Sequence, residues 1–383
     1  MRTIGDFEWK SKRVLLRVDL NSPIVKGKVE LTDRLKAHAG TARELSRKGA
    51  RVVMLAHQGR PGKSDFMGLR QHAKLLNRFL KVKFVDDVIG DKAVRAISRL
   101  KDGEVLLLDN VRFLKEEFHP GRNRMVKVLA PLFDIYVDDA FSVAHRNHTS
   151  IVSFPKVLPS CAGRVMEHEI NAVRSLKKFK KPSVFVLGGT KPEDELVLLR
   201  KLGKKVDKFL LCGVFAQYCM ACQGFDFGAQ NKYIRGLGYR RDKKVAKLLR
   251  KNVVLPVDFA VRKNGKRKDL GKEDFPVDYE IFDIGPKTQE MYRRIIGKAG
   301  SIFMKGTPGY SEEKQFSRGT RTVLEAIADS KAYSVVGGGH SAAAIERMRI
   351  SEKRFSHVSL SGGALVRYIA GEKLPGLEAL KHA

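Results

Sequence analysis

A short stretch toward the end of the chain combines residue types that can bind phosphate. The segment SVVGGGHSAAAIE (334–346) is an apolar run followed by Gly337, Gly338 and Gly339, then by His340 and Ser341 at the expected start of a helix. Backbone N–H groups at a helix N-terminus are unpaired and the helix dipole is positive there, so such a turn attracts anions. A phosphate that arrives with a divalent metal also needs a nearby carboxylate, because hard cations prefer oxygen ligands. His340 does not supply that group.

Polar side chains also follow apolar runs in the first half of the chain, where the sequence alternates between strand-like and helix-like segments. Nearly continuous apolar strands between amphipathic helices predict a parallel sheet covered on both faces. Ligands of such sheets bind at the carboxyl ends of the strands. We therefore expect a ligand site among the polar residues at these ends, which are Asp19, Asn21, His57, Arg60, Asn110, Arg112, Asp138 and Asp139.

The second half repeats the alternation, with glycine at the strand ends where the first half has charged residues. Glycine there lets a ligand approach the backbone closely. The segment 164–179 has the periodicity of one long helix and is interpreted as a connector. The sequence thus predicts an α/β protein of two doubly wound parallel-sheet domains joined by a hinge helix, whose closure would exclude water from a reaction. The expected parts are 1–163, 164–179, 180–365 and a C-terminal segment, 366–383, that returns toward the first domain.

Composition restricts the class of protein. The chain has 383 residues, 43% of them hydrophobic, which suits about two globular domains. Its first ten residues do not resemble a secretory signal, and no apolar run is long enough to cross a membrane. Four cysteines do not make a disulfide framework in a chain of this length. Cys219 and Cys222 form a C-x-x-C pair that favours buried packing over metal or redox chemistry, and we expect a cytoplasmic protein.

The charge is unusually positive, with 74 Lys and Arg against 42 Asp and Glu, a formal +32. Half of this excess lies in residues 171–275, where 26 basic and 10 acidic residues give a net +16. The densest runs occupy 240–251 and 262–272. Such surfaces attract polyanions such as RNA, DNA or ribosomes, and the absence of interleaved aromatic residues favours non-specific phosphate contacts. The alternative is a solvated face in an organism whose proteins are generally basic.

Six segments in order resemble signatures of the phosphoglycerate kinase family in its short archaeal form. They are LLRVDLNSPI (15–24), LAHQGRPG (55–62), LLLDNVRFLKEE (106–117), YVDDAFSVAHR (136–146), FDIGPKT (282–288) and GEKLPGLEAL (371–380). The resemblance runs from about residue 11 to residue 380. A P-loop kinase is excluded, because the glycine required five residues before Gly62 is His57.

The resemblance implies phosphoryl transfer between 1,3-bisphosphoglycerate and ADP, or in reverse between ATP and 3-phosphoglycerate, with Mg²⁺, as in glycolysis and gluconeogenesis. A small phosphorylated acid suits several guanidinium groups and a few polar anchors. Arg34 would neutralise the charge that develops on the transferring group. The implied phosphoglycerate ligands are Asp19, Asn21, His57, Arg60, Arg112 and Arg146.

For the nucleotide half, the resemblance implies a catalytic role for Lys191 and Gly338, with Lys191 also contacting phosphate. Glu312 matches a ribose-binding acid. The other nucleotide-binding positions implied by the match are Gly213, Gly337, Gly339, His340 and Ser341.

The same half departs from the family pattern. Where the family has the second of two lysines that serve phosphates, this chain has Glu195. His340 stands in place of the metal-binding carboxylate, and Lys305 stands in place of an asparagine. The triplet expected against adenosine reads Cys212, Gly213 and Val214, and the last glycine cluster begins with Ser361. Two unit charges about 4 Å apart interact by roughly 4 kcal/mol at an effective dielectric near 20, so replacing lysine by glutamate should shift phosphate binding by about twice that. We expect impaired catalysis unless the Glu195 side chain points away from the phosphates or a neighbouring residue takes over the role of the missing lysine.

Two readings follow. The first is a kinase, active or impaired, in which Lys305 and protonated His340 add positive charge, or His340 binds manganese or zinc. The second is a catalytically degenerate relative whose basic C-terminal domain binds nucleic acid or the ribosome, with residues 240–272 as the contact. No protein-held metal site is assigned, the metal requirement stays open, and a monomer is expected from the resemblance.

Overall fold

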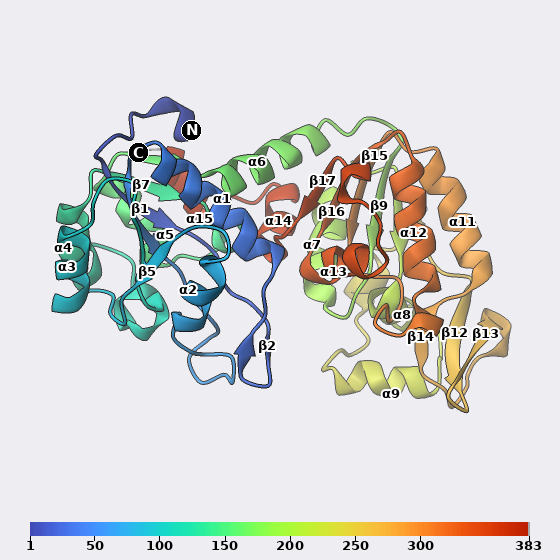
Figure 1. Ribbon diagram of the computed structural model, residues 1–383. Helices are drawn as coiled ribbons and strands as arrows, with labels where there is room; N and C mark the ends of the chain where they lie inside the picture. Colours follow the sequence, from blue (N-terminus) through green and yellow to red (C-terminus); the bar gives the residue numbers. More distant parts are fainter. Residues whose placement is uncertain (382–383) are drawn as a thin grey trace. The chain divides into compact units, whose positions relative to one another are not determined.

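The computed structural model describes residues 1–381, which divide into two compact units (Figure 1). The first comprises Met1–Ile170 with the C-terminal segment from Lys373, and the second comprises Asn171–Glu372. Residues 382 and 383 of the predicted C-terminal segment lie outside the described part.

The first unit is built on a six-stranded parallel sheet with the order β5-β6-β4-β1-β7-β8. Its strands are β1 (Arg13–Arg17), β4 (Arg51–Leu55), β5 (Val82–Phe84), β6 (Val105–Leu107), β7 (Ile135–Asp138) and β8 (Ser160–Ala162), and a short hairpin pairs β2 (Ile24–Val25) with β3 (Lys28–Val29). The helices are α1 (Asp33–Arg47), α2 (Arg70–Leu76), α3 (Asp91–Ser98), α4 (Arg124–Leu129), α5 (Thr149–Val152) and α15 (Pro375–Lys381). Because β1 is central, residues that follow it lie in the middle of the sheet's carboxyl edge.

The second unit is built on another six-stranded parallel sheet, ordered β11-β10-β9-β15-β16-β17. Its strands are β9 (Ser183–Leu187), β10 (Lys208–Leu211), β11 (Val253–Val254), β15 (Ser301–Lys305), β16 (Tyr333–Gly337) and β17 (His357–Ser359). The helices are α7 (Pro192–Leu202), α8 (Gly213–Cys222), α9 (Ala229–Gly236), α10 (Lys243–Ala246), α11 (Pro286–Gly297), α12 (Arg318–Asp329), α13 (Gly339–Arg347) and α14 (Gly363–Ile369). The prediction of two parallel-sheet α/β domains is therefore confirmed.

Helices cover both faces of the second sheet. Buried side chains of α11, α12 and α13 pack with β-strand residues in one apolar core, while α7 and α14 lie on the other side of the sheet (Figure 1). The first sheet has an equivalent core that includes buried residues of β1, β4, β7 and α1. Short 3₁₀ helices complete the chain at Ile4–Asp6, Val111–Phe113, Lys115–Phe118, Ala130–Leu132, Phe141–Val143, Phe154–Lys156, Lys272–Asp274, Lys314–Phe316 and Glu352–Arg354.

A small antiparallel sheet, absent from the sequence-based expectation, belongs to the second unit. It has the order β13-β12-β14, with β12 (Asp258–Lys263), β13 (Lys266–Gly271) and β14 (Ile281–Ile284). The apolar run 253–260 divides between β11 and β12, with Pro256, which has no N–H to donate, between them. The basic run 262–272 forms much of the β12–β13 hairpin, whose turn uses Asn264 and Gly265 at φ of 50° and 74°.

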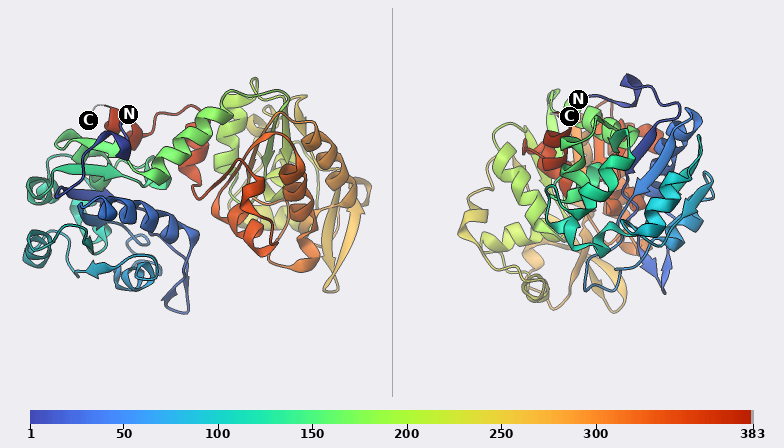
Figure 2. Two further views of the ribbon diagram at one scale, coloured as in Figure 1. Left: turned by 45° about the horizontal axis from the view of Figure 1, so that its top comes forward. Right: turned by 90° about the vertical axis from the view of Figure 1, so that its left-hand side faces the viewer.

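The predicted connector is helix α6 (Arg164–Leu176), which runs without interruption (Figure 2). The division between the two units falls within it. It ends three residues before the predicted limit, because Phe179 adopts a φ of 44°, in the left-handed region. In residues 1–381 no helix is both long enough and apolar enough to cross a membrane.

Candidate functional site

The carboxyl edge of the first sheet carries a buried network centred on Asp19, which follows β1. Its carboxylate accepts hydrogen bonds from Arg34 Nη1 at 2.6 Å, from the Asn21 N–H at 3.0 Å and from the Ser142 hydroxyl. Burial disfavours the charged carboxylate, but the Arg34 charge and these hydrogen bonds outweigh it and lower the pKa of Asp19. Asp19 is therefore an anion that fixes Arg34 at this edge.

His57, which follows β4, is held by an arginine that sequence reasoning missed. Arg17 Nη2 lies 3.1 Å from His57 Nδ1, and burial keeps the pKa of His57 well below its usual range. A guanidinium only donates hydrogen bonds, so Nδ1 of the neutral ring must accept and Nε2 must carry the hydrogen. His57 is thus set to donate from Nε2. The signal for Arg17 was an arginine directly after the three apolar residues of β1, Val14, Leu15 and Leu16.

The remaining predicted residues of this unit gather around the same edge. Asn21 Oδ1 accepts from the Gly59 N–H at 2.8 Å, which ties the loop bearing exposed Arg60 to the end of β1. Arg112 donates to the Gly59 carbonyl, and burial followed by the nearby Arg17 charge lowers its pKa to about 10. Half-buried Arg146 lies close enough for its charge to act on Arg112. The structure therefore brings Asp19, Asn21, Arg34, His57 and Arg112 into one network, with Arg146 beside it.

Three of the strand-end residues have structural roles. Asn110 donates to the backbone carbonyls of Gln58 and Met67, both at 2.8 Å. Asp139 accepts from His38 at 2.8 Å and from the backbone N–H of Val165. Asp138 accepts from the Ala140 N–H, and burial raises its pKa to about 7. These polar groups stabilise loops around the site, so position at a strand end alone did not separate ligand-facing from structural residues.

The second unit contains a cavity of about 310 Å³ with a largely apolar wall and a glycine rim. It includes three of the predicted nucleotide-binding residues, Gly213, Glu312 and His340. Its other lining residues are Gly189, Thr190, Val214, Gln217, Gln230, Tyr233, Glu280, Ile281, Phe282, Gly306, Thr307, Pro308, Gly309 and Tyr310. An apolar wall suits a flat base, and exposed Glu312 at the rim suits hydroxyl groups.

Two of the glycines are required by close packing of the turns that bound this cavity. Gly306 has a φ of 76°, and a Cβ there would lie 2.2 Å from the Gly188 carbonyl oxygen. Gly213 has a φ of 58°, and its Cβ would lie 2.8 Å from the Gly189 nitrogen. Side chains at these positions would push the turns after β9, β10 and β15 apart.

The turn after β16 has the form that the sequence predicted for a phosphate seat. Gly337 ends β16, Gly338 is the N-cap of α13 at a φ of 95°, and α13 begins at Gly339. His340 is exposed and lines the cavity, whereas Ser341 is buried with an Oγ that has no hydrogen-bond partner. The unpaired N–H groups of this turn therefore adjoin the cavity.

The departure at Glu195 is paired with the departure at Lys305. Lys305 Nζ donates to Glu195 Oε1 at 2.6 Å and contacts Asp194 Oδ2 at 3.1 Å. Burial raises the pKa of Glu195 to about 7, against the opposing effect of Lys305. Lys191, the N-cap residue of α7, is exposed. The Glu195 side chain is therefore held against Lys305 in an ion pair.

The donors at this edge do not fit a magnesium ion held by the protein. His340 offers an imidazole nitrogen, and the carboxylates of Asp194 and Glu195 already contact Lys305. Within residues 1–381 no cluster of three or more His, Cys, Asp and Glu side chains could hold a metal. Magnesium prefers oxygen ligands, so these side chains do not suit a magnesium ion held by the protein alone.

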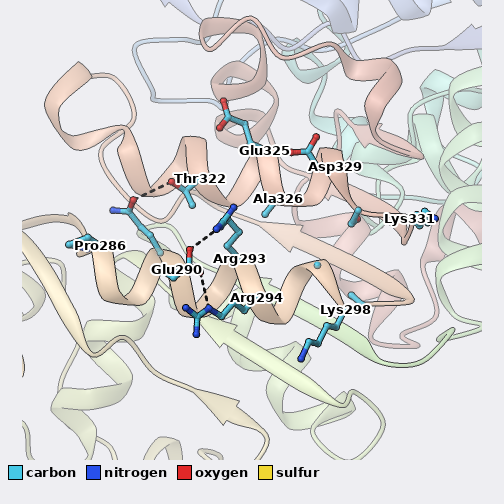
Figure 3. Close-up of a pocket in the computed structure, with 14 residues that line it drawn as sticks. Pro286, Glu290, Arg293, Arg294, Lys298, Thr322, Glu325, Ala326, Asp329 and Lys331 are labelled. Atoms are coloured by element: carbon cyan, nitrogen blue, oxygen red, sulfur yellow. Dashed lines mark hydrogen bonds and ion pairs between the residues drawn. The ribbon is translucent and has the colours of Figure 1, made fainter.

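Two other features are not candidate sites. A groove of about 810 Å³ lies between α11 and α12, where Glu290 pairs with Arg293 and Arg294 (Figure 3). It is formed by the outer surfaces of two helices and includes no strand end. Cys219 and Cys222 both lie on α8, and burial raises the pKa of Cys219 well above its usual range, which disfavours the thiolate that metal or redox chemistry needs.

Comparison with known proteins gives a consistent match. Residues 4–372 match the family model described as phosphoglycerate kinase. The phosphoglycerate kinase of Methanopyrus kandleri is 41% identical over 394 residues, covering 99% of this chain and 97% of that protein. That of Methanothermobacter thermautotrophicus is 41% identical over 400 residues, covering 100% and 97%.

Solved structures agree with the sequence comparisons. Phosphoglycerate kinase from Pyrococcus horikoshii OT3 is 37% identical with a TM-score of 0.94, covering 100% of this chain and 99% of that one. Phosphoglycerate kinase from Coxiella burnetii is 31% identical with a TM-score of 0.81, covering 99% and 98%.

The Arg17 contact predicts the tautomer of His57. Long-range ¹H–¹⁵N spectra of labelled protein at pH 7, with His57 assigned by comparison with His57→Gln, should show a neutral ring protonated at Nε2. In Arg17→Met the donor to Nδ1 is gone, so the signals should shift toward a mixture of tautomers. Finding the Nδ1–H form or a doubly protonated ring in the unaltered protein would contradict this assignment.

Proposed function

The chain belongs to the phosphoglycerate kinase family, and on this premise we propose that it transfers a phosphoryl group between ATP and 3-phosphoglycerate, or in reverse from 1,3-bisphosphoglycerate to ADP. The observation that carries the proposal is the buried network of Asp19, Arg34, His57 and Arg17 at one sheet edge. Burying several charges costs free energy, so stability alone does not account for this network, whereas binding of a small anion would. We further propose a cytoplasmic monomer.

The first unit supplies the ligands of the three-carbon acid. Arg60, Arg112 and Arg146 would bind the 3-phosphate through charge-assisted hydrogen bonds, and His57 would add one donated from Nε2. Asp19 and Asn21 would hold the hydroxyl and carboxyl end. These roles are supported by the hydrogen bonds and the charge interactions that connect these side chains.

The second unit supplies the nucleotide site. The adenosine would occupy the apolar cavity with its ribose near Glu312, and its phosphates would lie along the glycine turns and the start of α13. Lys191 would contact the transferring phosphoryl group. Magnesium chelated by the nucleotide would enter as part of the substrate.

In the ATP-consuming direction, a carboxylate oxygen of 3-phosphoglycerate forms a bond to the γ-phosphorus while the bond to the β,γ-bridging oxygen breaks. ADP leaves with the bonding electron pair, so no proton transfer is needed at the reacting atoms. Catalysis then depends on positioning and on neutralising charge on the moving group. Arg34, fixed by Asp19, is the residue that we assign to this neutralisation.

Turnover with 3-phosphoglycerate and Mg·ATP tests the proposal. We expect the purified protein to produce ADP, and Arg34→Met to lower kcat by about 10² to 10³-fold, as for loss of one transition-state donor. Arg95→Met, which alters an exposed arginine on α3, is the matched control and should match the unaltered protein. Absence of turnover in a protein that still binds 3-phosphoglycerate would favour the catalytically degenerate reading instead.

A second candidate function, polyanion binding, is favoured by the exposure of the basic run 240–251. Its exposed residues are Arg240, Arg241, Lys243, Lys244, Lys247, Arg250 and Lys251. The other basic run, 262–272, is less available for polyanion binding than its composition suggested, because two of its arginines contact other side chains. Arg267 is buried against Asp283 at 2.8 Å, and Arg262 pairs with Glu313 and stacks over Phe282.

Retention on ribosomal RNA at increasing salt tests this candidate. If the surface binds polyanions, changing Arg241, Lys243, Lys244 and Lys247 to Glu should abolish retention at about 0.1 M salt, because the phosphate contacts are electrostatic. The control reverses four exposed basic residues of the first unit, Lys74, Arg95, Arg99 and Lys101. Equal loss in both variants would mean that only net charge matters and that no dedicated surface exists.

A further inference from the structure

Lys305 has a fixed position that the roles assigned above do not use. Its side chain is 12% exposed and that of Glu195 is 2% exposed, so their 2.6 Å ion pair is largely removed from solvent. Asp194 adds a second carboxylate at 3.1 Å. Replacing such a pair by apolar residues often leaves stability unchanged or improves it, so stability alone does not account for this cluster.

The backbone places Lys305 beside the predicted phosphate seat. It is the last residue of β15, and its register partners are Leu187 at the end of β9 and Gly337 at the end of β16. Its Cγ lies 4.0 Å from the point that a Cβ on Gly338 would occupy, and Gly338 is the N-cap of α13. The next residue, Gly306, lines the cavity of the second unit. The lysine therefore stands where the cavity adjoins the unpaired N–H groups of the turn.

The ammonium group can make one more hydrogen bond. It carries three protons, and its contacts in the structure are the two with Glu195 and Asp194. Glu195 Oε2 is buried without a partner, so the hydrogen bonding of this carboxylate is directed to Lys305 through its other oxygen. The two carboxylates fix the position of Nζ while leaving it a donor for an incoming anion.

We propose that Lys305 is the cation that contacts the phosphate groups of the bound nucleotide, held in place by Glu195 and Asp194. A lysine from the end of β15 then supplies the charge that a lysine on α7 would supply in the family pattern. The proposal rests on the proposed function, since it assigns a ligand to the nucleotide site of that function. It also accounts for why Glu195 and Lys305 depart from that pattern together.

The test compares a phosphorylated with an unphosphorylated ligand. In the double variant Glu195→Gln with Lys305→Met, size and net charge are nearly preserved and no lone charge is buried. We expect its dissociation constant for ADP to rise about tenfold or more, the effect of one hydrogen bond from a charged donor. Its affinity for adenosine should be unchanged, because adenosine has no phosphate. Unchanged adenosine binding also reports that the second unit is folded.

Lys298→Met is the matched control. Lys298 is the exposed C-cap residue of α11, three residues before β15 begins at Ser301, and so lies at the opposite end of that strand from Lys305. This variant should bind ADP as the unaltered protein does. Titrations are made at one ionic strength, with and without Mg²⁺.

The outcomes separate this inference from the proposed function. The inference is wrong if the double variant binds ADP as well as the unaltered protein does, or if it loses affinity for adenosine and for ADP equally. Lys305 then has only a structural role. Turnover of the unaltered protein would still support the proposed kinase function. If the unaltered protein binds ADP no better than adenosine and has no turnover, both the inference and the proposed function are wrong.

Discussion

Charged side chains buried at the carboxyl edges of the two parallel sheets have to be paired, because an unpaired ion in a protein interior costs several kcal/mol. In the first unit this requirement joins Asp19 to Arg34, and a neutral His57 to Arg17. In the second unit it joins Glu195 to Lys305. Each pair restricts a polar group to one position at the edge of its sheet, so the energetic cost of burial is linked to preorganisation of that edge.

The two sheets use the same edge for different chemistry. The first unit surrounds its edge with guanidinium groups and an imidazole donor, which suits a small acid that carries a phosphate. The second unit uses glycine turns that bring backbone close to a ligand, together with an apolar wall that suits a base. The side chains that follow the strands, rather than the sheets themselves, account for the difference in ligand.

Much of this arrangement follows from the sequence. Apolar runs alternating with amphipathic helices predicted both sheets. The motifs that resemble a kinase family identified the residues around Asp19, and the three glycines before His340 predicted the turn at Gly338. Three features were beyond such reasoning. The role of Arg17 depends on a contact across two strands, and the structural use of Asn110 and Asp139 depends on loops that are distant in sequence. The antiparallel sheet was missed because β13 lies within the run 262–272, which was interpreted by charge, and β14 overlaps the motif 282–288, which was interpreted by resemblance.

Glu195 illustrates the limit most clearly. Taken alone, a glutamate in place of a phosphate-binding lysine predicts repulsion of the ligand. Residues 195 and 305 are 110 positions apart, and only the fold shows that their side chains meet at 2.6 Å. The two departures from the pattern therefore form one ion pair, in which Lys305 offsets the negative charge of Glu195 at the end of β15.

A crystal structure of the protein with ADP bound is the measurement that addresses the central claim most directly. The account predicts the base against Ile281 and Phe282, and a phosphate oxygen within hydrogen-bond distance of Lys305 Nζ while Glu195 still contacts the same ammonium group. Phosphates that lie away from Lys305, or a nucleotide bound outside this cavity, would contradict it.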